Sequence, residues 1–170
     1  MKRFLCVVAL SIATTFGVCA QKFALVDMQY ILKNIPDYEM MNEQLETISK
    51  KYQQEISKLE NSAEAKYKKY QSDLVFLSVE QKKQREEEIV KIEQQASELQ
   101  SKYFGPDGEL FKKRTDMMKP IQDEIWETIK QIAKENNFQL VLDRGTSGII
   151  FANPSIDISD LVLSKMGFAK

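Results

Sequence analysis

The chain has 170 residues, of which 24 are basic and 25 acidic, and it contains no histidine. Without histidine it lacks the commonest general base, the usual zinc ligands and every nucleophile system that needs an imidazole, so we expect no enzyme, no cofactor and no metal site. The near-neutral charge balance does not indicate uniform nucleic-acid binding. Only six glycines and four prolines interrupt the chain, and charged residues make up 29%, which is typical of an elongated helical protein.

The first twenty residues have the layout of a secretory signal peptide. A basic start at residues 2–3 precedes an uncharged apolar run over 4–18, and Val18-Cys19-Ala20 then offers a cleavage site before Gln21. The run is shorter than the roughly 20 residues of a membrane-spanning helix, so a retained anchor is the less favoured alternative. Lipidation at Cys19 is also less favoured, because the residues before it lack the lipoprotein pattern. We predict export to the periplasm without stable membrane insertion.

The mature chain from residue 21 is suited to an oxidising compartment. Both cysteines, Cys6 and Cys19, lie in the removed segment, so no thiol and no disulfide remains. Removal of Lys2 and Arg3 leaves 22 basic residues against 25 acidic ones, a net charge of −3.

The mature chain begins with a short strand and a short helix. Residues 23–27 form an apolar run rich in β-formers, and Met28, Ile31 and Leu32 follow at helical spacing. Pro36 suits the first turn of the next helix, where acidic residues would lie near its positive end.

A long arm is predicted over residues 37–104. Its apolar residues recur at spacings of 3, 4 and 4, which is an eleven-residue period and indicates a nearly straight coiled coil. The residues on this repeat are Leu45, Ile48, Tyr52, Ile56, Leu59, Ala63, Tyr67, Tyr70 and Leu74. The tyrosines among them are interpreted first as seam residues.

The arm is predicted to fold back on itself near residues 74–80. The period breaks at residues 75–79, Ser78 and Gln81 form a capping-box pattern, and a new apolar stripe begins at Ile89. The simplest account is a hairpin of two helices. Glu86-Glu87-Glu88 is interpreted as a solvated helix face.

Gly105-Pro106-Asp107-Gly108 is predicted to end the returning helix as a turn or hinge. A calcium loop is a weak alternative, because the alternating oxygen ligands are missing. A further helix follows. Residues 139–143 and 148–152 are predicted to be two strands of a β-hairpin, and Asp157 or Ser159 can cap a last helix.

These elements predict an α+β fold, mostly α, in which a small β body carries a long protruding α-helical coiled-coil hairpin. The body comprises residues 21–36 and 105–170, with strands near 23–27, 139–143 and 148–152. The open edges of such short strands favour pairing with other chains.

The tip of the hairpin is the candidate binding site. Residues 66–85 carry six basic and two acidic side chains, and a hairpin end cannot bury all the apolar residues gathered there. Local packing across the turn is an equally weighted alternative for Phe76 and Leu77. The candidate site residues are Tyr70, Leu74, Val75, Phe76, Leu77, Val79, Lys66, Lys69, Lys82, Lys83 and Arg85.

Three segments resemble the Skp/OmpH family of periplasmic chaperones: Phe-Ala-Leu-Val-Asp-Met-Gln-Tyr-Ile at 23–31, Phe-Gln-Leu-Val-Leu-Asp at 138–143, and Asp-Ile-Ser-Asp-Leu-Val-Leu-Ser-Lys-Met-Gly at 157–167. Their order around a charged hairpin extends the resemblance over residues 22–168. It implies a homotrimer with a joint β-barrel-like body, whose arms surround unfolded outer-membrane proteins and hold them without ATP. The chain differs from the strongly basic members of this family in its charge and in the break at 105–108.

The resemblance makes a holdase chaperone the expected function. The alternative is a structural coiled-coil protein of the envelope that acts as a spacer with a self-associating body. A spacer would not keep an unfolded barrel protein soluble, so a client-binding test separates the two.

Overall fold

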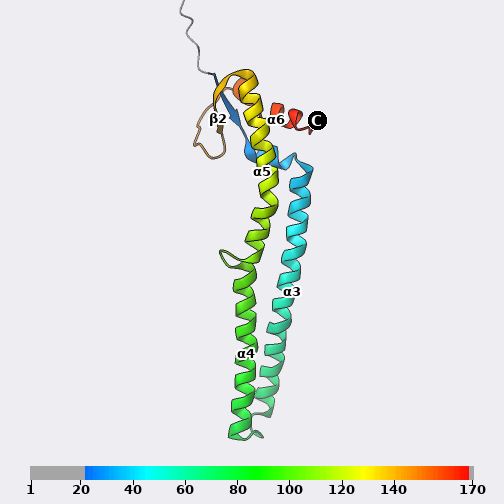
Figure 1. Cartoon of the computed structure of the whole chain (residues 1–170). Coiled ribbons are helices and arrows are strands. Elements are labelled where there is room, and N and C mark those ends of the chain that lie inside the picture. Colours follow the sequence, from blue (N-terminus) through cyan, green and yellow to red (C-terminus); the bar gives the residue numbers. More distant parts are fainter. Residues whose placement is uncertain (1–21, 169–170) are drawn as a thin grey trace, which may run out of the picture.

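A computed structural model describes residues 22–168, and the predicted signal peptide at residues 1–20 lies outside them. A long hairpin of helices extends from a small body that contains both ends of the described chain (Figure 1). The elements in order are β1 (Lys22–Val26), α2 (Met28–Lys33), α3 (Pro36–Asp73), α4 (Val79–Phe104), α5 (Glu109–Asn136), β2 (Phe138–Asp143), the 3-10 helix η1 (Pro154–Ile156) and α6 (Ser159–Lys165). The α+β fold, mostly α with a protruding hairpin, is confirmed.

Local sequence signals set the ends of the two arm helices. Pro36 occupies the first turn of α3, with Asp37 and Glu39 beside the partial positive charge of that end. The predicted capping box opens α4: Ser78 Oγ accepts the Gln81 N–H at 3.3 Å, and Gln81 Oε1 accepts the Ser78 N–H at 3.0 Å. The chain therefore reverses direction over residues 74–78.

The seam of the hairpin follows the eleven-residue repeat along most of α3. The buried seam residues are Leu45, Tyr52, Ile56 and Ala63 from α3, and Ile89, Ala96 and Tyr103 from α4. The repeat stops being buried at Tyr67, which is 49% exposed, so its interpretation as a seam residue is wrong. Beyond Tyr67 the facing stretch of α4, from Glu80 to Glu88, carries no apolar residue, so the apolar seam does not continue to the tip.

The returning limb of the hairpin continues beyond the break at residues 105–108. Helix α4 ends at Phe104, but α5 runs on in nearly the same direction beside α3, and the four intervening residues form a loop at its side (Figure 1). Met41 and Leu45 of α3 belong to the same buried cluster as Ile121 and Ile125 of α5. The hairpin is thus longer than the predicted arm of residues 37–104.

The body contains a two-stranded parallel sheet, in which Phe23 of β1 is opposite Leu140 of β2 and Val26 is opposite Asp143. The predicted β-hairpin of 139–143 with 148–152 is wrong, because β2 pairs with β1 and no strand forms over 148–152. Nothing in the described chain buries Ile150 and Phe151, which are 102% and 85% exposed. Strand-forming residues indicate pairing, but they do not say that the partner is on the same chain.

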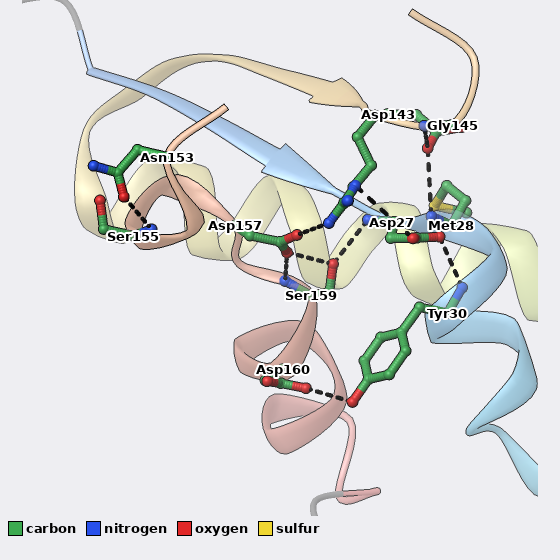
Figure 2. Close-up of polar contacts among 11 residues, drawn as sticks. Asp27, Met28, Tyr30, Asp143, Gly145, Asn153, Ser155, Asp157, Ser159 and Asp160 are labelled. Atoms are coloured by element: carbon green, nitrogen blue, oxygen red, sulfur yellow. Dashed lines mark hydrogen bonds and ion pairs between the residues drawn. The ribbon is translucent and has the colours of Figure 1, made fainter. Parts of the chain in front are cut away.

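A polar hub joins the start of α2 to the start of α6, as Figure 2 shows. The buried Ser159 Oγ accepts the Asp27 N–H at 2.8 Å and donates to Asp157 Oδ1 at 2.6 Å. Asp157 Oδ1 also accepts the Ser159 N–H at 2.9 Å. The N-cap of α6 is Ile158, which makes no side-chain cap bond, so the predicted cap by Asp157 or Ser159 is wrong. Burial raises the pKa of Asp157, but hydrogen bonds from Ser159 and Arg144 outweigh it and hold the pKa below its ordinary value.

Candidate functional site

The tip of the hairpin exposes three large apolar side chains. Val75 is 88% exposed, Phe76 is 87% exposed and Val79 is 85% exposed. They surround the short turn between α3 and α4, where the amide of Phe76 donates to the carbonyl of Asp73 at 2.8 Å. Residues held on a turn between two helices are presented at a fixed place, and a cluster of exposed apolar groups usually marks a binding surface.

The remaining apolar candidates at the tip are less available. Leu74 is 39% exposed and Leu77 is partly buried, so both offer less apolar surface to a client than Val75, Phe76 and Val79. Tyr70 is partly buried, and its hydroxyl donates to a carboxylate oxygen of Glu86 across the seam. The structure therefore brings together Val75, Phe76 and Val79 as one exposed group, which we call the tip patch.

Two of the five basic candidates at the tip, Lys66 and Arg85, join the two helices. Arg85 pairs with Asp73 at 2.9 Å and Lys66 pairs with Glu88 at 2.7 Å, each across the seam. Lys83 lies 3.9 Å from Glu87 on its own helix. The two pairs across the seam stand where apolar seam residues are missing near the tip. Exposed pairs of this kind contribute only about 0–1 kcal/mol each.

Lys69 and Lys82 are the candidates that take part in no ion pair among residues 22–168. The predicted excess of positive charge at the tip is thus smaller in the folded arm than in the sequence. An apolar contact is better supported there than an electrostatic one.

The sequence interpretation missed a cluster of aromatic and charged residues beside the break at residues 105–108. The rings of Tyr52 and Tyr103 stack with centroids 3.8 Å apart, and Phe104 meets Tyr52 edge-on at 6.4 Å. The Tyr52 hydroxyl donates to Glu109 Oε2 at 2.8 Å, and the Tyr103 hydroxyl donates to Glu55 Oε2 at 2.9 Å. Both bonds link α3 to the returning limb on the two sides of the break.

The bond between Tyr52 and Glu109 changes the pKa of both groups. Burial, assisted by this hydrogen bond, raises the pKa of Tyr52 from 10.0 to about 12. The same hydrogen bond lowers the pKa of Glu109 below its ordinary value of 4.5. Because the pKa of Tyr52 is higher in the folded chain than in the unfolded one, its protonated form adds to the stability of the fold below pH 10.0, and this stability is lost as the pH rises towards 12. Because the pKa of Glu109 is lower in the folded chain than in the unfolded one, its ionised form adds to the stability of the fold above pH 4.5, and this stability is lost as the pH falls below that value.

Tyr52→Phe is therefore expected to lower the urea midpoint of unfolding near pH 7. The difference in urea midpoint between this variant and the unchanged chain should become smaller below pH 4.5 and above pH 10.0. Urea titrations followed by circular dichroism from pH 3 to 11 measure it. Tyr38→Phe is a control that touches a different part of α3. A gap that stays constant with pH would show that the Tyr52 hydroxyl contributes no charge-dependent stability.

No helix among residues 22–168 is long and apolar enough to cross a membrane. The family model described as outer membrane protein (OmpH-like) matches residues 22–166, which is nearly the whole described chain. The chain belongs to the OmpH-like family. This membership confirms the resemblance that the terminal segments indicate.

Curated relatives of this OmpH-like chain span nearly its whole length. Chaperone protein Skp of Yersinia enterocolitica is 24% identical over 168 residues, covering 98% of this chain and 99% of the relative. Chaperone protein Skp of Photorhabdus laumondii is 27% identical over 165 residues, covering 95% and 98%. A solved OmpH-like outer membrane chaperone from Caulobacter crescentus shares the fold with a TM-score of 0.70 at 15% identity, covering 88% of this chain and 86% of that chain.

Proposed function

We propose that this protein is an ATP-independent periplasmic holdase that binds unfolded outer-membrane proteins and prevents their aggregation. The observation that carries the proposal is the tip patch: Val75, Phe76 and Val79 lie almost fully exposed at the far end of an arm. The full-length relatives named Chaperone protein Skp support the same function. The predicted signal peptide at residues 1–20 supports export to the periplasm.

The tip patch suits weak and exchangeable binding of unfolded chains. Covering one large apolar side chain contributes roughly 1.5–3 kcal/mol, which is too little for tight binding by a single contact. Several arms that act on one client raise the overall affinity through effective concentration, while each contact remains short-lived. Such binding needs no nucleotide, since apolar contacts form and break at equilibrium.

We further propose that the body assembles a homotrimer. The outer edge of β2 has no strand partner within residues 22–168, and its Leu140 and Leu142 are 45% and 36% exposed. The strand-forming segment 148–152 lies nearby in sequence with Ile150 and Phe151 exposed. An unpaired edge and an unpaired strand segment on the same protomer favour pairing between copies. The number of three copies is what the resemblance to the Skp/OmpH family implies.

Ile150→Asp is therefore expected to dissociate the assembly into monomers, because it places a charge where we propose an apolar contact between chains. Sedimentation velocity of the mature chain measures the oligomer. Ser147→Asp is the matched control, since it adds the same charge in the same loop at a polar position. An unchanged oligomer in the Ile150 variant would place the assembly contacts elsewhere.

The alternative function is a structural spacer of the envelope, and a light-scattering experiment separates it from a holdase. A denatured outer-membrane β-barrel protein is diluted from urea into buffer, with and without the mature chain and without ATP. A holdase suppresses the scattering when its assembled form is equimolar with the client. A spacer leaves the scattering unchanged, and that result would overturn the proposal.

A further inference from the structure

The break at residues 105–108 forms one side of an apolar groove on the arm, about 350 Å³ in volume. A groove of this size is at the lower end of the range that proteins use to hold small ligands, roughly 300–1,000 Å³. Its apolar lining comes from α3, the end of α4, the break and the first turns of α5: Leu45, Tyr103, Phe104, Pro106, Leu110 and Phe111.

The two glycines of the break allow the loop to lie close against the end of α4. A Cβ atom on Gly105 would lie 2.4 Å from the carbonyl oxygen of Ser101, and one on Gly108 would lie 2.7 Å from that of Tyr103. No other residue fits at either position without a backbone shift. The loop is therefore a tightly built turn, and the bonds of Tyr52 and Tyr103 to Glu109 and Glu55 hold α3 against both of its ends.

Among the large apolar residues that line the groove, Phe111 is the exposed one. It is 57% exposed, and it belongs to neither of the two buried clusters of the described chain. The fold thus leaves a large aromatic ring on the wall of an apolar groove. Covering it would stabilise a complex.

Arg114 supplies the only charge among the residues that line the groove. It takes part in no ion pair within residues 22–168. A guanidinium group at the rim of an apolar site binds a carboxylate well, because it offers several donors in a planar fork.

We propose that this groove is a second client site on the arm, and that it takes an aromatic side chain of an unfolded polypeptide that is followed or preceded by a carboxylate. The apolar lining with Phe111 covers the ring, and Arg114 pairs with the neighbouring acidic residue. The inference rests on the proposed holdase function and specifies one class of client segment. It places a binding site in the arm at a distance from the tip patch.

Two unfolded peptides test the proposal with the full mature chain. Both are twelve-residue Gly/Ser peptides with two phenylalanines and an N-terminal fluorophore, and they differ only in having Asp or Lys beside each phenylalanine. Fluorescence anisotropy gives their affinities. We expect the unchanged chain to prefer the Asp peptide several-fold, Arg114→Glu to reverse this preference, and Phe111→Ser to weaken the Asp peptide about tenfold, equivalent to about 1.4 kcal/mol.

Two controls match these variants. Lys112→Glu makes the same charge change two residues earlier, about 200° around the helix and outside the groove. Val90→Ser removes an apolar side chain of similar exposure, 59%, from the middle of α4. Both should leave the peptide preference unchanged. Thermal midpoints of all four variants should stay within a few degrees, because the altered side chains are exposed.

The groove proposal fails if Arg114→Glu keeps the Asp preference, or if Lys112→Glu loses it equally, since the effect would then come from the general charge of the arm. It also fails if Arg114→Glu and Phe111→Ser change the oligomer seen by sedimentation velocity, which would make a second copy of the chain the occupant of the groove. If the chain suppresses scattering of unfolded outer-membrane protein but binds the Asp and Lys peptides equally well, the holdase function stands and only the groove proposal is wrong.

Discussion

Ile125→Ala is expected to lower the free energy of unfolding by about 2–5 kcal/mol, which is the usual cost of removing a buried isoleucine side chain beyond its β-carbon. Ile125 is 0% exposed. It lies on α5 in the buried cluster that joins the first turns of α3, with Met41 and Leu45, to the body. The cavity would therefore weaken the junction through which the arm is attached. Much of the stability of a domain, typically 5–15 kcal/mol, depends on such sites.

Urea unfolding followed by circular dichroism at fixed protein concentration measures this loss. Val90→Ala is the matched control, because it truncates an apolar side chain that is 59% exposed, and a change below about 0.5 kcal/mol is expected for it. Equal losses in the two variants would show that the cluster around Ile125 does not stabilise the junction.

Replacing Val75, Phe76 and Val79 together with serine is expected to weaken client binding by at least about tenfold and to leave the thermal midpoint unchanged. The three side chains are exposed in the free arm, so the fold loses little burial when they are removed. Each side chain contributes roughly 1.5–3 kcal/mol to client binding when a client covers it fully. A client that covers the three side chains only partly, on several arms, would still lose about tenfold in affinity when they are removed. Leu77 is left in place because it is partly buried.

The test of the tip patch is the affinity for a fluorescent, urea-denatured outer-membrane protein, measured together with thermal unfolding. Val90→Ser provides an exposed apolar position away from the tip. If the triple variant melts many degrees lower with unchanged affinity per folded molecule, the three residues are packing residues and the tip patch is not a client site.

The periodic part of the arm could be predicted because burial along a helix depends on residue spacing. The eleven-residue repeat found Leu45, Tyr52, Ile56 and Ala63 correctly, and the capping box at Ser78 placed the start of α4. The repeat failed at Tyr67, where the facing helix decides burial. The pairs of Asp73 with Arg85 and Lys66 with Glu88 depend on the register between two helices, which spacing within one helix does not reveal.

The body was harder to predict because its contacts connect distant segments. Residues 139–143 and 148–152 have the pattern of a local hairpin, but β2 pairs instead with β1, more than a hundred residues earlier. The glycines at 105 and 108 indicated a break, whereas the continuation of α5 beside α3 follows from the packing of Ile121 and Ile125. The groove beside Phe111 was missed for the same reason, although aromatic residues on both sides of a glycine-rich break are a usable signal.

Sedimentation velocity of a fluorescent outer-membrane β-barrel protein, diluted from urea into the mature chain without ATP, tests the holdase function most directly. Detection at the fluorophore reports only the client. We predict one species that contains the client with one assembled chaperone, stable in solution and free of fast-sedimenting aggregate. Client that sediments as aggregate at the same rate with and without the chain would contradict the holdase function.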